Sequence, residues 1–143
     1  MDNGTGVDRM AIILFSGTVD KLMAASILTS GGVAMGMEVE LFLTNWGLQA
    51  FRKDAWKTNA KISAEYAEFA PAMMAAMQEK NVPSWMDNIL QAKELGEVRV
   101  NACGMTMELF GMQKCDLEDI VDDVVGVAGF VGDAQDAKIT LFI

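Results

Sequence analysis

Residues 98–112, VRVNACGMTMELFGM, join an apolar run typical of a strand to a segment typical of a helix. Val98 to Ala102 predicts a buried strand, Cys103-Gly104 predicts a turn, and Met105 to Met112 predicts a helix. Strands that pass into helices in this way are the units from which parallel sheets are built. We therefore expect an α/β fold in which Cys103 lies at the carboxyl end of a strand.

The same alternation continues on both sides of this stretch. Four further strands are predicted where apolar runs end at turn residues: 10–15, 38–43, 124–127 and 138–143. Further helices are predicted at 20–30, capped by Asp20, at 58–80, at 85–95, at 117–121, capped by Asp116, and at 131–137. Near-continuous apolar strands that alternate with helices predict a parallel sheet with helices on both faces.

The length and charge of the chain bound its class. With 143 residues, 52% of them hydrophobic, the chain is expected to form a single domain, 1–143, with a helical insertion at about 58–96. A formal net charge of −9 with scattered Lys and Arg argues against nucleic-acid binding. Residues 1–9 are polar and acidic, which argues against a leader peptide, and charges with Pro83 interrupt the Met-rich run well short of a membrane span. We expect a cytoplasmic protein.

The absence of histidine restricts the chemistry most. It removes Ser/His/Asp triads, Cys/His pairs and the commonest transition-metal ligand together, so we predict no metal site. The two cysteines are too few for a disulfide framework, and a reducing compartment would keep them as thiols. Both cysteines are therefore available for reaction.

Cys103 is the residue most suited to carry that reaction. At a strand-to-helix joint, unpaired backbone N–H groups and the helix dipole favour the thiolate, which is the nucleophilic form. Gly104 would permit close approach of a substrate, and the amides around Gly104 and Met105 would stabilise the thiolate and bound anionic oxygens. The alternative is that Cys103 is a small buried hydrophobic side chain.

Cys115 is a weaker candidate. The acidic residues that follow it, Asp116, Glu118 and Asp119, disfavour a thiolate through like charge. It could still resolve an oxidised or sulfur-loaded Cys103, although the sequence does not show whether the two thiols can meet.

Loops at the carboxyl ends of the first two strands are expected to lie beside Cys103, because ligands in such sheets gather at that edge. These loops supply candidate substrate-binding residues: Ser16, Gly17, Thr18, Asn45 and Trp46. The first loop lacks the dinucleotide and P-loop patterns, so nucleotide binding is not favoured. Methionines at 73, 74 and 77 predict core packing or a subunit interface.

The stretch Val100 to Met112, with its Ala-Cys-Gly-Met-Thr-Met core, resembles the cysteine motif of the DsrE/DsrF/DrsH-like family of small sulfur-relay proteins. The resemblance extends to Ile12–Asp20, Phe42–Gly47 and Pro83–Met86. It implies a three-layer α/β/α sandwich on a five-stranded, mainly parallel sheet, assembly into a homo-oligomer, and a cysteine, here Cys103, that carries sulfur as a persulfide or thiosulfonate. It also implies partners of the TusA, rhodanese or heterodisulfide-reductase type.

Three functions therefore remain open from the sequence. The first is sulfur transfer or carriage by Cys103, with small sulfane-sulfur donors and neither a metal nor an organic cofactor. The second is a thiol redox enzyme of peroxidase type that uses Cys103 and Cys115. The third is a non-catalytic oligomeric binding module.

Overall fold

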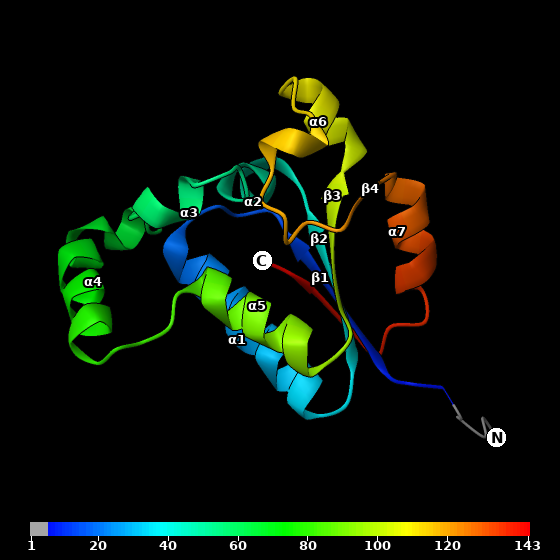
Figure 1. Cartoon of the computed structure of the whole chain (residues 1–143), viewed down its shortest axis with the longest axis horizontal. Helices are drawn as coiled ribbons and strands as arrows, with labels where there is room; N and C mark the ends of the chain where they lie inside the picture. Colours follow the sequence, from blue (N-terminus) through cyan, green and yellow to red (C-terminus); the bar gives the residue numbers. More distant parts are fainter. Residues whose placement is uncertain (1–5) are drawn as a thin grey trace.

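A five-stranded parallel sheet forms the centre of the computed structural model, which describes residues 6–143 (Figure 1). The strands are β1 (Arg9–Leu14), β2 (Glu38–Leu43), β3 (Val98–Cys103), β4 (Asp123–Val125) and β5 (Ile139–Phe142). Their order across the sheet is β4-β3-β2-β1-β5, and every neighbouring pair is parallel. The predicted α/β class is confirmed.

Helices cover both faces of this sheet (Figure 1). They are α1 (Val19–Ala34), α2 (Asn45–Ala50), α3 (Ala55–Thr58), α4 (Ala70–Glu79), α5 (Trp85–Leu95), α6 (Gly104–Leu109) and α7 (Val127–Ala134), with short 3₁₀ turns η1 (Ala64–Phe69) and η2 (Lys114–Asp116). On one face, Leu22 of α1 and Ile89 of α5 belong to the main core. On the other face, Phe130 of α7 stacks on Phe42 of β2 at 4.4 Å between ring centroids and shares a smaller cluster with Cys103. The two helical layers and the sheet form the predicted three-layer sandwich.

Helix α1 extends further than the glycine pattern predicted. It continues through Gly31 and Gly32 to Ala34. Gly32 faces the sheet, where a Cβ atom would lie only 2.9 Å from Cγ2 of Val39. The helix ends at Ala34 with Met35 as its C-cap residue, and Gly36 follows with a φ of 76°, which glycine adopts without strain. The glycine at 32 therefore serves close packing.

The helix predicted at 58–80 is wrong over its first part. Residues 59–63 are not helical, and helical turns resume only in η1 and α4. The intervening segment bonds instead to the start of α1, where the Val19 N–H donates to the Lys61 carbonyl and the Ser63 hydroxyl donates to Asp20 at 2.6 Å. Asp20 is thus the second residue of α1 and anchors a distant segment, while Thr18 is the N-cap residue. The boundary of the insertion, about 58–96, stays a prediction.

The helix predicted at 117–121 is also wrong. Asp116 closes η2, its carboxylate accepting the Gln113 N–H at 2.8 Å, so it caps the turn before it. Leu117 then forms an antiparallel bridge with Arg52, and the Glu118 N–H donates to the Phe51 carbonyl at 2.8 Å. These tertiary bonds hold Leu117 extended, and Asp119 and Ile120 form a turn that the bond from the Val121 N–H to the Glu118 carbonyl closes at 3.1 Å. The last predicted helix is present as α7, but it begins at Val127 because Gly126 is its N-cap.

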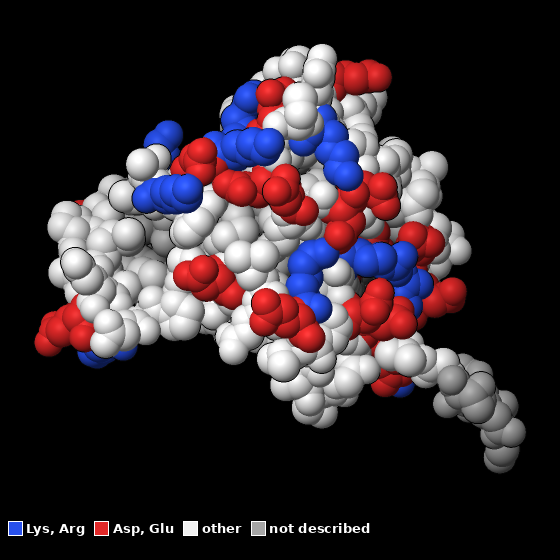
Figure 2. All heavy atoms as spheres, viewed as in Figure 1, with Lys and Arg blue, Asp and Glu red and all other residues white. Residues whose placement is uncertain are grey.

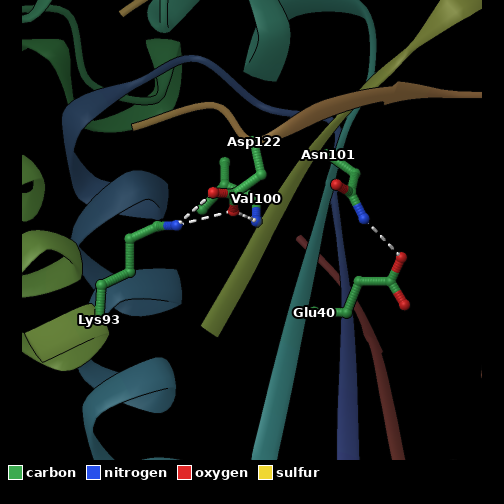
Figure 3. A network of polar contacts seen from close by, with 5 residues as sticks. All are labelled: Glu40, Lys93, Val100, Asn101 and Asp122. Atoms are coloured by element: carbon green, nitrogen blue, oxygen red, sulfur yellow. Dashed lines mark hydrogen bonds and ion pairs between the residues drawn. The ribbon is translucent and has the colours of Figure 1, made fainter. Parts of the chain in front are cut away.

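Asp122 holds the segment before β4 against β3 (Figure 3). Its carboxylate accepts Lys93 Nζ at 2.7 Å and the Val100 N–H at 2.8 Å. Asp122→Ala should lower the free energy of unfolding by about 1–3 kcal/mol, because the buried Val100 N–H loses its acceptor. Lys93→Met leaves that acceptor in place and should cost under about 1 kcal/mol in the same urea titration. An equal loss in Lys93→Met would show that the ion pair is the stabilising contact.

The described residues include no helix that is both long and apolar enough to cross a membrane. The prediction that a leader peptide is absent rests partly on residues 1–5, and these lie outside the described residues.

Candidate functional site

Cys103 is the last residue of β3 and the N-cap residue of α6, as the sequence predicted for a strand-to-helix joint. Its register partner on β4 is Val125, and it shares the small core cluster with Phe42 and Phe130. The residue is 6% exposed. Cys103 is therefore a buried thiol on the face of the sheet that α7 covers.

Hydrogen bonds offset the effect of this burial on the thiol. Burial raises the pKa of Cys103, but the hydroxyl and backbone N–H of Thr106, the hydroxyl of Thr44 and the backbone N–H of Met105 all lower it, and the net pKa lies below the ordinary thiol value. These donors stabilise the thiolate that burial alone would disfavour. The thiolate consequently persists to lower pH than that of an ordinary cysteine.

Thr44 and Thr106 join the ends of β2 and β3 beside this thiol. Their hydroxyl oxygens lie 3.1 Å apart, and the Asn45 N–H donates to Thr106 Oγ1 at 3.2 Å. Thr44 Oγ1 donates to Asn45 Oδ1 at 3.0 Å. Sequence reasoning missed both threonines. Thr106 follows Cys103 by three residues in the first turn of α6, and that spacing is the signal that could have identified it.

The other residues predicted around Cys103 separate into two places. Gly104 and Met105 are beside the thiol, and the Met105 side chain is 75% exposed. Gly104 makes only ordinary contacts, since a Cβ there would lie 3.6 Å from its nearest neighbours. An apolar rim on this side of the molecule includes Leu109 at 71% exposure and Trp46 at 54%, whose ring lies 5.8 Å from that of Phe110.

Ser16, Gly17, Thr18 and Trp46 line a cavity of about 690 Å³ that Cys103 does not line. Lys21, Lys61 and Glu65 also contribute to this cavity. Close by, partial burial raises the pKa of Asp20, but hydrogen bonds from Ser63 outweigh it and hold that pKa below its ordinary value. The predicted substrate-binding residues of the first loop thus share a cavity, while Asn45 contacts the threonines beside Cys103.

Figure 3 shows a buried polar pair, Glu40 and Asn101. Asn101 precedes Cys103 by two residues on β3, so the pair lies on the same face of the sheet as the thiol. Asn101 Nδ2 donates to Glu40 Oε1 at 3.0 Å, and Arg9 Nη2 lies 3.7 Å from Glu40 Oε2. Both Glu40 and Asn101 are buried. The pair links β2 to β3 two residues before Cys103.

Cys115 lies in η2 and is exposed, with its Sγ 3.7 Å from Gln113 Oε1. Both cysteines are free thiols. Because the Lys53 N–H donates to the Asp116 carbonyl at 3.0 Å, η2 is attached to the chain just after α2. Acidic and basic side chains are interspersed over the face shown in Figure 2.

Known proteins resemble this chain over nearly its whole length. The DsrE/DsrF/DrsH-like family matches residues 6–77 and 63–142. The chain is 35% identical to the uncharacterized protein YrkE of Bacillus subtilis, over 94% of this chain and 96% of that protein. It is 30% identical to the sulfur carrier protein DsrE2 of Allochromatium vinosum, over 94% and 98% of the two chains.

A solved structure has the same fold. It is that of MTH1491, a protein of unknown function from Methanobacterium thermoautotrophicum, with a TM-score of 0.56 and 18% identity over 90% of this chain and 91% of that chain. Together, the fold and the sequence matches across nearly all of the described residues establish that this chain belongs to the DsrE/DsrF/DrsH-like family.

Proposed function

We propose that this protein is a sulfur carrier or sulfurtransferase of a cytoplasmic sulfur relay, with the sulfur held on Cys103 as a persulfide or thiosulfonate. The observation that carries the proposal is the buried Cys103 thiol, whose pKa is lowered by hydroxyl and N–H donors from Thr44, at the start of α2, and from Met105 and Thr106 of α6. The relative named as a sulfur carrier, DsrE2, supports the same role.

The proposed reaction is a balanced exchange of sulfane sulfur. The Cys103 thiolate attacks the outer sulfur of a persulfide or polysulfide donor, a new S–S bond forms, and the donor leaves as a thiolate. An acceptor thiolate then attacks the outer sulfur on Cys103, that S–S bond breaks, and the Cys103 thiolate returns. The amides of the α6 start would stabilise the negative charge in both states.

Partners of the TusA or rhodanese type, implied by the family resemblance, fit this reaction because they exchange sulfur through thiols. The exposed side chains of Met105, Leu109 and Trp46 offer them an apolar rim. Assembly into a homo-oligomer stays a prediction. So do the substrate contacts expected of the loop residues Ser16, Gly17, Thr18, Asn45 and Trp46. Met73 packs against the edge of the core, whereas α4 has no buried residue.

Intact-mass spectrometry after incubation with polysulfide tests the proposal directly. The wild-type chain should gain the mass of one or more sulfur atoms, peptide mapping should place the gain on Cys103, and a small acceptor thiol should remove it. Sulfur mapped to Cys115, or a chain that gains no sulfur, would contradict the proposal.

A further inference from the structure

Asn45 has an unusual backbone. It is the first residue of α2, and its φ of 48° lies in the left-handed region, which few residues other than glycine and asparagine adopt. Strained backbone of this kind persists only where the surrounding structure holds it, and it is frequent at functional sites. The Asn45 N–H in this conformation reaches across to Thr106 Oγ1 at 3.2 Å.

Each of the two threonine hydroxyls has a single proton, which limits the hydrogen bonds that the pair can donate at one time. Thr106 Oγ1 accepts the Asn45 N–H, so its own proton is free for either Thr44 Oγ1 or the Cys103 sulfur. While Cys103 is a neutral thiol, Thr44 donates its single proton to Asn45 Oδ1 at 3.0 Å and acts as the acceptor in its contact with Thr106. Its donation to the sulfur follows only when the thiolate forms. When the thiolate forms, the Thr106 hydroxyl can turn from Thr44 to the sulfur without leaving the Asn45 N–H unpaired.

We propose that Asn45 is a positioning residue, whose left-handed backbone holds its N–H on Thr106 Oγ1 and thereby aims the Thr106 hydroxyl at the Cys103 thiolate. The inference rests on the proposed function and assigns Asn45 a role in place of the substrate contact predicted for it. It also gives a physical reason why the pKa of a buried thiol lies below its ordinary value in a chain that contains no histidine: the groups that lower it are two hydroxyls and two N–H groups.

Charged groups do not account for this effect. The elements packed around Cys103 carry several charged side chains: Glu38, Glu40, Arg99, Glu108, Asp123 and Asp133. The groups that lower the pKa of Cys103 are nevertheless all uncharged donors. A variant that moves the Thr106 hydroxyl therefore acts on the thiolate through this hydrogen bond.

The test is the rate of Cys103 alkylation by iodoacetamide against pH, in a Cys115→Ser background so that one thiol reports. Thr106→Val keeps the shape of the side chain but removes the hydroxyl, so the profile should move to higher pH and the rate at pH 7 should fall about tenfold. Thr106→Ser should retain the original profile. A Thr106→Val profile that coincides with the parent would overturn the proposal.

Asn45 is tested by a pair that separates backbone from side chain. Asn45→Gly adopts the left-handed region freely and keeps the N–H, so its profile should match the parent. Asn45→Ala disfavours that region and should shift the profile in the direction of Thr106→Val. If glycine shifts the profile as much as alanine does, the Oδ1 atom is responsible and the backbone role is refuted.

Sulfur loading, measured separately, distinguishes the two proposals. A wild-type chain that takes up no sulfur, with the alkylation profiles in the expected order, would defeat the proposed function alone. A chain that loads sulfur normally, with coincident profiles for all variants, would defeat the role of Asn45 alone. Thermal melts identify any variant that fails to fold. If an Asn45 variant fails to fold, the comparison of Thr106→Val with Thr106→Ser still tests the hydrogen bond on which the proposal depends.

Discussion

Cys103→Ser should take up no sulfur from polysulfide and should pass none to an acceptor thiol, whereas Cys115→Ser should do both at the wild-type level. A serine hydroxyl is not ionised at neutral pH and is a weak nucleophile without an adjacent base, and the chain contains no histidine to supply one. Cys115 lies exposed in η2, outside the buried cluster to which Cys103 belongs. We expect the loss in Cys103→Ser to exceed a hundredfold, since the bond-forming atom is removed.

The measurement is intact mass after loading, followed by transfer to a small thiol and quantification of the sulfur that leaves. Far-UV circular dichroism of Cys103→Ser checks that the buried position tolerates the change. Loss of function in Cys115→Ser as well would favour the two-cysteine redox alternative. In that case peroxide should produce a bond between the two cysteines, and turnover should depend on both.

Gly47→Ala should destabilise the fold by about 3 kcal/mol or more, or prevent folding. A Cβ atom at Gly47 would overlap the carbonyl oxygen of Leu14, which is backbone of β1 and cannot move without disturbing the sheet. Gly17→Ala should behave similarly, because its Cβ would overlap the carbonyl oxygen of Trp46. The two glycines let the turn after β1 and the start of α2 interlock, which places Asn45 and Thr44 next to the Cys103 site.

Gly31→Ala is the matched control for these variants. Gly31 lies within α1 and is exposed, and a Cβ there would meet nothing within 4 Å. Alanine has the higher helix propensity, so this variant should gain roughly 0.5–1 kcal/mol. Urea unfolding of the three variants measures the differences. If Gly17→Ala or Gly47→Ala were as stable as Gly31→Ala, the backbone segments that meet at these glycines could move apart without loss of stability, and the prediction would be wrong.

Much of the architecture follows from local sequence. The strands β2 and β3 and the helix α5 can be predicted from the sequence, because apolar runs and helix breakers such as Pro83 determine the conformation of the residues next to them. The same local signals place Cys103 at the joint between β3 and α6, because the alternation of strand and helix leaves one position for the turn. The absence of histidine, also a property of sequence, directs the chemistry to this thiol.

Bonds between distant segments decided the remainder. Residues 59–63 leave the helical conformation because they bond to the start of α1, and residues 117–121 do so because they bond to the chain after α2. The hydroxyl pair of Thr44 and Thr106 joins residues 62 positions apart, so no local sequence pattern could predict this contact. Sequence alone therefore predicted a candidate nucleophile, Cys103, and its place at the carboxyl end of β3. The donors that stabilise its thiolate, and the cavity formed by Ser16, Gly17, Thr18 and Trp46, depend on contacts that exist only once the sheet has formed.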